Sequence, residues 1–222
     1  VPGDQLAGIH YLRKLDDVNA IRSELRDRSK ICIVGGGYIG LEVAAVMNSS
    51  GYDVTVIESE NRVLKRVTTP QMSSLFHKLH LSKGVKIYSD TLVTGFSGSK
   101  RVEHVNCKDF EIPADIVIVG IGIIPNVEIA QDSGIQCQDG ILVDDRCQTS
   151  EANIYAAGDN TNHPNTILNR RLRLESVPNA MEQARVSAAN MLGQDKIYKS
   201  LPWFWSNQYN LKLQMLGFSE DG

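Results

Sequence analysis

The sequence predicts an α/β fold in which helices cover a parallel β-sheet and an antiparallel meander follows. Three observations support this prediction. Short apolar, β-branched runs alternate with amphipathic segments, the links between them are short, and the first run ends on three glycines. Parallel strands need crossover connections, so a strand–helix–strand–helix–strand alternation is typical of a right-handed parallel sheet.

Three strands and two helices make up the alternating part. Residues 30–34, 54–57 and 85–88 are short apolar runs typical of buried parallel strands. Residues 38–50 have apolar side chains at helical spacing, and Gly51 follows as a stop signal. The order of these segments predicts that the first strand leads through the glycines directly into the first helix.

The second helix is expected to begin at Thr69 and to end at Gly84. Threonine is a favoured N-cap residue, and Pro70 fits the first helical turn, where its missing N–H costs nothing. The apolar face of this helix is expected to consist of Met72, Leu75, Phe76 and Leu79.

After this region the pattern changes. Residues 91–113 contain short polar–apolar stretches typical of an antiparallel meander, and residues 115–119 return to a fully buried strand. The remaining expected elements are helices at 126–133 and 178–192 and strands at 141–143 and 154–156.

The composition is that of a protein with a buried core, since 42% of the residues are hydrophobic and 22% are charged. A formal net charge of −3 gives no basic field that would attract nucleic acid or an anionic membrane surface. The longest apolar run, residues 116–124, is too short to span a bilayer. We therefore expect neither a nucleic-acid partner nor a membrane partner.

The four cysteines, Cys32, Cys107, Cys137 and Cys147, are widely spaced and form no Cys-x-x-Cys pair. This spacing argues against a dithiol redox centre and against a cysteine-ligated metal site. No leader typical of secretion opens the chain, so we expect reduced thiols in a cytoplasmic protein. The chain begins without Met and stops within an expected strand at residues 211–218, which indicates a piece of a longer protein.

The strongest local signal is the sequence GGGYIG at residues 35–40, which satisfies G-x-G-x-x-G through Gly35, Gly37 and Gly40. In this motif Gly35 permits the tight turn, and Gly37 lets a pyrophosphate approach the backbone. Gly40 lets the helix pack closely on the strand. The N-terminus of the following helix offers free amide donors to the phosphates. A strand before the motif and a helix after it predict a Rossmann-like dinucleotide site.

An acidic residue, Glu58, ends the second expected strand about 20 positions after the motif. At this position a carboxylate accepts hydrogen bonds from the adenosine ribose hydroxyls and repels a 2′-phosphate. The sequence therefore favours NAD over NADP. Arg62 and Arg66 follow closely and temper this preference, and an ordinary surface glutamate at a strand end is the alternative.

Several stretches of sequence together identify a family. They are YLR and LDD within residues 11–17, GGGYIGLE at 35–42, RVL at 62–64, RV at 66–67, GIGIIPN at 120–126, YAAGD at 155–159, ESVPNAMEQA at 175–184 and PWFWSNQY at 202–209. With these stretches the chain resembles the flavin- and NADH-dependent ferredoxin reductases of the putidaredoxin reductase type. The resemblance covers essentially the whole chain. Its last two stretches are the most specific.

The resemblance implies a division into domains. Residues 1–24 would lead out of an FAD-binding domain, and residues 25–121 would form a Rossmann-like NAD-binding domain. Residues 122–200 would be the second half of the split FAD-binding domain, and residues 201–222 would begin a C-terminal α/β domain. The family's first glycine-rich unit, which holds the FAD pyrophosphate, has no counterpart in this sequence.

The resemblance also implies which residues bind NAD. They are Gly35, Gly37, Tyr38, Ile39, Gly40, Glu42, Glu58, Arg66 and Gly122. Glu42 would face the nicotinamide carboxamide, although a solvated helix glutamate is the simpler interpretation of that position.

A second set of residues would contact FAD by the same resemblance. It consists of Arg13, Asp159, Glu175, Ser176 and Val177. Asp159 would meet the ribityl chain, and the backbone of Val177 would meet the flavin ring, where a helix N-terminus stabilises negative charge. By spacing alone, the YAAGD stretch is more readily a generic turn after a strand.

The activity implied is that of a flavoprotein oxidoreductase that passes electrons from NADH through FAD to a [2Fe–2S] ferredoxin, serving an oxygenase. No catalytic side chain is expected, because the cofactors carry the hydride and electron chemistry. Alternatives are a rubredoxin reductase, a flavoprotein like NADH oxidase, and a non-catalytic NAD-binding fragment. The oligomeric state stays open.

Two surface features have alternative interpretations. Trp203 and Trp205 lie either near the flavin or the ferredoxin surface, or in a joint between domains. Four arginines, at positions 170, 171, 173 and 185, form either a basic dock for an acidic ferredoxin or a solvated loop.

Overall fold

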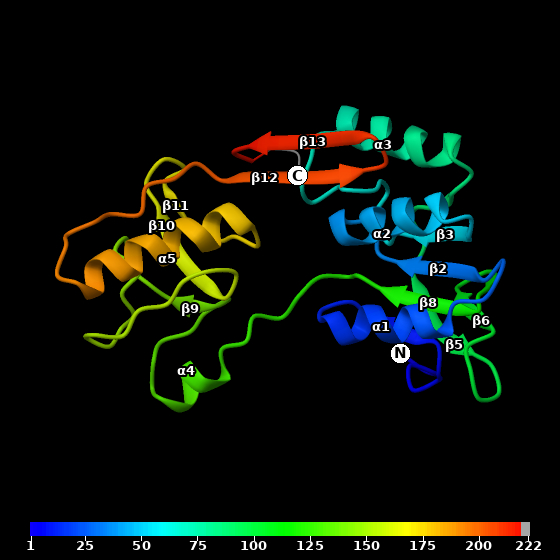
Figure 1. Ribbon diagram of the computed structural model, residues 1–222, viewed down its shortest axis with the longest axis horizontal. Helices are drawn as coiled ribbons and strands as arrows, with labels where there is room; N and C mark the ends of the chain where they lie inside the picture. Colours follow the sequence, from blue (N-terminus) through cyan, green and yellow to red (C-terminus); the bar gives the residue numbers. More distant parts are fainter. Residues whose placement is uncertain (219–222) are drawn as a thin grey trace. The chain divides into compact units, whose positions relative to one another are not determined.

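The computed structural model describes residues 1–218, which fall into two compact units. The first unit contains Val1–Gly122 and Ser206–Leu213, and the second contains Ile123–Trp205 and Gln214–Gly217. Figure 1 shows the course of the chain through these elements. The chain thus leaves the first unit after Gly122 and returns to it at Ser206–Leu213.

A five-stranded parallel sheet forms the centre of the first unit and confirms the predicted fold class. Its order is β1 (Ile9–Tyr11), β8 (Ile116–Val119), β2 (Lys30–Val34), β3 (Asp53–Ile57) and β4 (Lys86–Tyr88). Helices α1 (Leu15–Glu24), α2 (Tyr38–Ser49) and α3 (Pro70–Ser82) connect the strands. The strand order reverses between β2 and β8, and α/β folds bind ligands at the carboxyl ends of strands at such a switch point.

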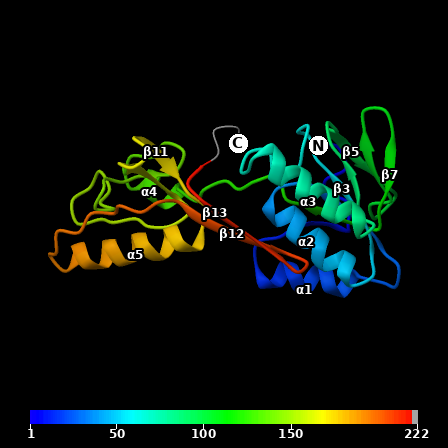
Figure 2. The same cartoon turned by 90° about the horizontal axis from the view of Figure 1, so that it is seen from above.

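The predicted meander is present as three antiparallel strands, β5 (Val93–Ser97), β6 (His104–Cys107) and β7 (Glu111–Pro113). Its apolar side chains, including Phe96 and Val105, share a buried cluster with Cys32 and Val117 of the parallel sheet. Figure 2 shows the meander on one side of the sheet and the three helices on the other. Both faces of the parallel sheet are therefore covered, which explains why its strands are almost continuously apolar.

Helix α3 begins where the sequence predicts, and Phe76 of the predicted apolar face is buried, but Leu75 is not. Leu75, expected in the apolar face, is 48% exposed, whereas Ser73, Phe76 and His80 are buried. The prediction that Leu75 belongs to the buried face is therefore wrong. Polar residues take buried positions because they find partners there: the Ser73 hydroxyl donates to the carbonyl of Val63 at 2.6 Å.

Strand β1 belongs to the parallel sheet, where it pairs with β8 from Ile9 to Tyr11. Residues 1–24, which the resemblance separates from the domain that begins at residue 25, lie in the same compact unit as residues 25–122. The sequence does not reveal this pairing, because β1 has only three residues and its partner lies about 100 positions away.

The second unit contains α4 (Glu128–Asp132), β9 (Ile141–Leu142), β10 (Thr161–Asn165), β11 (Arg170–Arg173) and α5 (Val177–Met191). The strand expected at residues 154–156 is absent, and Tyr155 forms only an isolated bridge with Gln148. Strands β10 and β11, which pair antiparallel, were not predicted. Strand β10 contains two asparagines and a proline, which are depleted in strands, so tertiary contacts determine this pairing.

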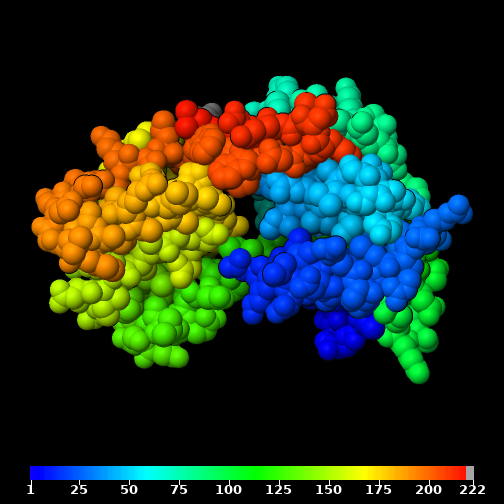
Figure 3. Space-filling model, in the orientation of Figure 1, coloured from blue at the N-terminus to red at the C-terminus, as the bar shows by residue number. Residues whose placement is uncertain are grey.

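A two-stranded hairpin, β12 (Trp203–Gln208) and β13 (Leu211–Leu216), ends the described chain. Its tip, Ser206–Leu213, belongs to the first unit. In the space-filling view of Figure 3, the orange-red surface of this tip is continuous with the cyan surface of the neighbouring helices. The expected strand at 211–218 is thus largely confirmed, and residues 219–222 lie outside the described residues.

Two further observations concern the described residues as a set. None of their helices has the length and apolar character needed to cross a bilayer. The four cysteines are free thiols, and Cys32, Cys107 and Cys147 are buried.

Candidate functional site

The turn after β2 has the geometry that its glycines predict. Gly35 has a φ of +110°, and a Cβ there would lie 2.3 Å from the carbonyl oxygen of Gly120. A Cβ on Gly40 would lie 1.9 Å from the carbonyl oxygen of Gly35. Only glycine fits at either position, so α2 packs directly against the turn and the turn directly against the end of β8.

Gly37 differs from its two neighbours in the motif. It has a φ of −78°, and a Cβ there would meet no atom within 4 Å. The space in front of Gly37 is therefore open rather than filled by protein. As the N-cap of α2, Gly37 also lies where unpaired helix amides and the helix dipole attract anions. This cradle fits a phosphate-bearing ligand.

A cavity of about 400 Å³ opens in front of this cradle, at the carboxyl ends of the parallel strands. Four of the predicted NAD residues line it: Gly35, Gly37, Glu58 and Arg66. The cavity therefore unites the glycine turn with the acidic end of β3, which the spacing of the motif predicts.

The Glu58 carboxylate is fixed against the glycine turn. Its Oε2 accepts a hydrogen bond from the backbone N–H of Gly36 at 2.7 Å. Its Oε1 accepts from the backbone N–H of Glu60 at 2.8 Å and from the Ser59 hydroxyl at 3.2 Å. The side chain is therefore held in one orientation, with its negative charge at the cavity wall.

Arg66 brings the opposite charge to the same cavity. Its side chain is exposed, whereas the neighbouring Lys65 is ion-paired with Glu60 at 2.6 Å. This hydrogen bond with Lys65 lowers the pKa of the Glu60 carboxyl. The cavity thus presents a fixed carboxylate at position 58 and a solvated guanidinium at position 66.

Glu42 lies one turn into α2 and does not line the cavity. Its Oε1 accepts hydrogen bonds from the Ser206 hydroxyl at 2.6 Å and from the Asn207 backbone N–H at 3.3 Å. The simpler interpretation of Glu42 as a solvated helix residue is therefore wrong. The carboxylate is half-buried and bound by the hairpin.

The other predicted NAD residues surround the turn without lining the cavity. Tyr38 and Ile39 are the first residues of α2, and Ile39 is 47% exposed. The Tyr38 hydroxyl donates to the carbonyl of Val67. Gly122 follows β8 and has a φ of +124°, a conformation that favours glycine.

Sequence reasoning missed other residues that line the cavity. Examples are Asp4, Tyr11, Thr91, Phe96 and Ile121. Tyr11 and Ile121 each end or follow a strand of the parallel sheet, so the strand-end rule would have found them once β1 was recognised. Asp4 and Thr91 have no sequence signal, because only the folded chain brings them to this edge.

In the second unit, Arg173 connects two predicted FAD residues. Its Nη1 donates to the Glu175 carboxylate at 2.8 Å and to the backbone carbonyl of Asp159 at 3.4 Å. Its Nε donates to Asp139 at 2.9 Å. Although burial acts in the opposite direction, these carboxylates raise the pKa of Arg173. Asp159 and Glu175 are thus held close together.

Ser176 and Val177 begin α5. The Ser176 side chain accepts from the backbone N–H of Asn179 at 3.4 Å and caps the helix. Val177 is 57% exposed at the first helical position. The predicted contact residues therefore lie at a helix N-terminus, as the sequence predicts.

The buried side chain of Gln183 connects α5 to the turn that contains Asp159. Its Oε1 accepts from the Gly158 N–H at 2.7 Å and from the Thr161 hydroxyl at 2.8 Å. The Asn179 amide donates to the same oxygen at 3.4 Å. These hydrogen bonds fix the turn to helix α5. The turn lies immediately before β10, whereas the sequence predicts that it follows a strand at residues 154–156.

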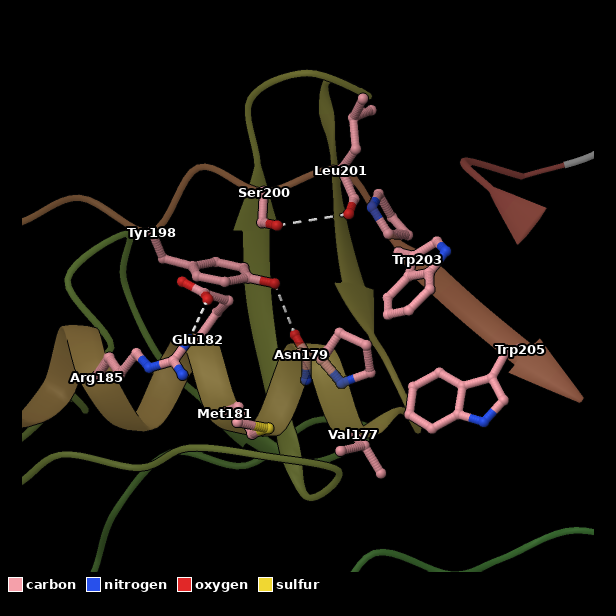
Figure 4. A pocket seen from close by; sticks show the side chains of 12 residues that line it. Val177, Asn179, Met181, Glu182, Arg185, Tyr198, Ser200, Leu201, Trp203 and Trp205 are labelled. Atoms are coloured by element: carbon pink, nitrogen blue, oxygen red, sulfur yellow. Dashed lines mark hydrogen bonds and ion pairs between the residues drawn. The ribbon is translucent and has the colours of Figure 1, made fainter. Parts of the chain in front are cut away.

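A second cavity, of about 390 Å³, lies between α5 and residues 198–205. Figure 4 shows Trp203 and Trp205 facing it from β12, opposite Val177 and Met181 of α5. The two indole rings are 5.2 Å apart at 35°. Both tryptophans thus lie near a predicted flavin residue.

Arg13 lies in the first unit, immediately before α1. Its side chain is exposed, and its backbone N–H donates to Asp17 Oδ2 at 2.8 Å. That bond and one from the backbone of Lys14 lower the pKa of the Asp17 carboxyl. The structure does not bring Arg13 together with the other predicted FAD residues within one unit.

The arginines considered as a basic dock are mostly bound within the second unit. Arg171 donates to the carbonyls of Val143 and Asn162, and Arg173 is paired with two carboxylates. Arg185 is exposed and paired with Glu182. Their charge is therefore partly neutralised where they stand.

Comparisons with known proteins agree with this geometry. A family model described as pyridine nucleotide-disulphide oxidoreductase matches residues 1–184. The chain is 44% identical over 214 residues to putidaredoxin reductase of Pseudomonas putida, covering 95% of this chain and 51% of that protein. The chain thus spans about half the length of the curated relatives it matches.

Two solved structures are similar over almost the whole chain. One is the ferredoxin reductase for the CYP199A2 system from Rhodopseudomonas palustris, with a TM-score of 0.95 and 39% identity over 99% of this chain and 55% of that one. The other is the covalent putidaredoxin reductase–putidaredoxin complex, with a TM-score of 0.92 and 42% identity. That match covers 98% of this chain and 53% of the other.

Proposed function

Because the chain belongs to the pyridine nucleotide-disulphide oxidoreductase family, we propose that it binds NADH as part of a flavoprotein reductase. In this proposal the whole protein passes electrons from NADH through FAD to a [2Fe–2S] ferredoxin. The observation that carries the proposal is the cradle at Gly37, which opens into a cavity beside the fixed carboxylate of Glu58.

Each part of that cavity suits one part of NADH. The open backbone at Gly37 and the N-terminus of α2 suit the pyrophosphate. Glu58 suits the adenosine ribose hydroxyls, and its charge disfavours the 2′-phosphate of NADPH. Arg66 adds a cation for the phosphates. The remaining NAD residues, Tyr38, Ile39, Gly40, Glu42 and Gly122, then shape the turn and the nicotinamide end.

For FAD, we propose that residues 122–200 supply the second part of a binding domain. The support is that Asp159, Glu175, Ser176 and Val177 lie close together in one unit, with Gln183 fixing the turn. Arg13 would contact FAD from residues 1–24. When bound there, FAD would supply the hydride-accepting and single-electron chemistry. In this proposal, the chain's own residues would orient FAD, with the N-terminus of α5 near the flavin ring.

The ferredoxin partner is supported by the similarity to the putidaredoxin reductase of the covalent complex. Trp203 and Trp205 offer apolar anchors beside the second cavity. Arg185 is exposed but paired with Glu182, so it could contribute to docking an acidic protein only by exchanging this partner. We place the protein in the cytoplasm, where its four free thiols stay reduced.

Coenzyme binding tests the central claim. Purified chain is titrated with NADH and with NADPH by calorimetry, and NADH should bind the more tightly. Glu58→Arg should shift the ratio of the two dissociation constants towards NADPH by roughly tenfold, because a cation replaces the repelling carboxylate. Glu111→Arg makes the same charge change on the exposed meander and should leave the ratio unchanged.

Two outcomes contradict the proposal. If neither coenzyme binds at millimolar concentration, the cavity is not a dinucleotide site. If both bind but Glu58→Arg leaves the ratio unchanged, Glu58 is not the ribose ligand.

The electron acceptor is tested on the full-length protein loaded with FAD, by comparing a [2Fe–2S] ferredoxin, a rubredoxin and oxygen. Faster reduction of rubredoxin or oxygen would favour one of the alternative reductases.

A further inference from the structure

A line of hydrogen bonds runs from Glu42 into the interior of the first unit. The Ser206 hydroxyl donates to Glu42 Oε1 at 2.6 Å and accepts from Gln208 Nε2 at 3.1 Å. Gln208 Oε1 lies 2.9 Å from His80 Nε2. Ser206, Gln208 and His80 each have 0% exposure, so the line is shielded from water up to the half-buried carboxylate of Glu42.

The direction of each bond follows from the groups involved. A serine hydroxyl has one proton, and it goes to the carboxylate, so the oxygen is left as an acceptor for the Gln208 amide. The Gln208 carbonyl oxygen accepts only, so the proton on the imidazole is at Nε2. Donors therefore point from His80 towards Glu42 at every step, and the series ends on the only carboxylate.

The residues come from three elements that are far apart in sequence. Glu42 is on α2, His80 is on α3, and Ser206 and Gln208 are both on β12. Alternate residues of a strand share one face, which explains why positions 206 and 208 reach the helices together. Burial lowers the pKa of His80, against the opposing effect of its bond to Gln208, so the buried end of the series is neutral near pH 7.

These contacts determine the orientation of the Glu42 carboxylate. Both of its bound donors, the Ser206 hydroxyl and the Asn207 N–H, use Oε1. Oε2 is therefore the oxygen that accepts neither of these hydrogen bonds from the hairpin. A carboxylate fixed through one oxygen is preorganised to accept a hydrogen bond through the other.

We propose that Ser206, Gln208 and His80 are positioning residues that orient Glu42 to accept a hydrogen bond from the carboxamide of the nicotinamide. The inference rests on the proposed function, because it requires NADH in the neighbouring cavity. It extends that proposal to three residues outside the glycine motif. It assigns to the segment PWFWSNQY a role at the NAD end of the protein.

The test compares NADH with ADP-ribose, which has the same adenosine, ribose and diphosphate but no nicotinamide. Ser206→Ala should weaken NADH binding by about fivefold, the effect of one hydrogen bond, and leave ADP-ribose binding unchanged. Ser206→Thr keeps the hydroxyl and should bind both as the parent does. Calorimetry of each variant with each ligand gives the constants.

A matched control separates positioning from a merely structural role of the hairpin. Tyr209 is the hairpin's other anchor, since its hydroxyl donates to Asn48 Oδ1 on α2 at 3.1 Å. Tyr209→Phe removes this anchor and the 3.5 Å contact of its hydroxyl with His80 Nδ1, while the ring can keep its edge contact with His80. The bonds from Ser206 to Glu42 and between Gln208 and His80 stay in place. This variant should lower the melting temperature but leave NADH affinity unchanged.

A double variant tests whether Ser206 acts through Glu42. Adding Ser206→Ala to Glu42→Gln should weaken NADH binding no further than Glu42→Gln alone.

The outcomes distinguish the two proposals. If the parent chain binds neither NADH nor ADP-ribose, the proposed function fails. If it binds both and Ser206→Ala weakens neither or weakens both equally, the positioning role is wrong while the dinucleotide site stands. ADP-ribose binding and the thermal melt also show whether Ser206→Ala is folded. If it is not, Gln208→Met, which leaves the Ser206–Glu42 contact in place, should give the same ligand-specific loss in weaker form.

Discussion

His163 on β10 is the residue whose burial has the clearest consequence for stability. It has 0% exposure, and neither ring nitrogen has a hydrogen-bond partner among the described residues. Its ring meets the edge of Tyr198 at 5.0 Å. Burial, with a smaller contribution from the charge of Arg171, lowers the pKa of His163 to about 4. The native state therefore holds this imidazole neutral.

The stability of the fold should consequently fall as the pH is lowered from about 6.5 to 4. In that range the unfolded chain binds a proton at His163 and the folded chain does not, which favours unfolding. The pKa difference corresponds to on the order of 3 kcal/mol over the whole range. Urea denaturation between pH 7 and pH 5 measures the slope. His163→Leu should flatten it, and His104→Gln, on the half-exposed surface of β6, should not.

An unchanged slope in His163→Leu would show that other groups govern this range. His80 is the nearest alternative, because burial lowers its pKa in the same direction. Acidic groups such as Asp17 have pKa values lowered by their hydrogen bonds, so their effect falls below this pH range.

At the scale of elements, the glycine turn and helix α2 act as one piece, and two glycines allow their roles to be separated. Gly40→Ala should destabilise the first unit by about 3 kcal/mol or more, because the new Cβ would overlap the carbonyl oxygen of Gly35. Gly37→Ala should leave the melting temperature nearly unchanged but weaken NADH binding, since its Cβ meets only open space. Thermal melts and calorimetry of both variants provide the check.

A Gly37→Ala variant that binds NADH as well as the parent would mean that the diphosphate does not approach this backbone. A Gly40→Ala variant that melts with the parent would mean that α2 can move away from the turn without loss.

The elements also show what sequence reasoning can and cannot predict. Strands β2, β3 and β8 were predicted because their apolar runs report burial on both faces. Strand β10 was not, because several of its polar residues are buried and find partners distant in sequence, as the Asn165 amide donates to the carbonyl of Ser200. Strand β11 was not, because only Leu172 among its four residues is apolar. Local patterns of apolar and polar residues do not reveal such long-range contacts.

The same limit applies to the candidate site. Gly35, Gly37 and Glu58 were found because the dinucleotide motif fixes their spacing, and the structure brings them to one cavity. The contact between Glu42 and Ser206 was not found, because 164 positions separate the two residues. Sequence patterns can therefore reveal site residues that are close together in the chain, but not contacts between residues that are far apart in it.

At the scale of the molecule, residues 120–126 join the two units. This link has no helix or strand, and Ile121 and Ile124 are 64% and 89% exposed. Limited digestion with subtilisin should therefore cut first within this link, and mass spectrometry locates the cut. NADH should slow the cut, because Ile121 lines the proposed coenzyme cavity. A first cut in the exposed loop at residues 98–101, or a rate unaffected by NADH, would contradict this expectation.

The bond from Gly36 to Glu58 has a consequence for redesign of the coenzyme site. The carboxylate that is proposed to sense the ribose also completes the hydrogen bonding of the turn. A substitution that reverses the charge at position 58 therefore leaves the Gly36 N–H without its acceptor. The same substitution thereby destabilises the glycine turn that is proposed to bind the pyrophosphate. Conversion to an NADPH-dependent protein thus calls for a paired change, in which one residue receives the extra phosphate and another restores the lost acceptor.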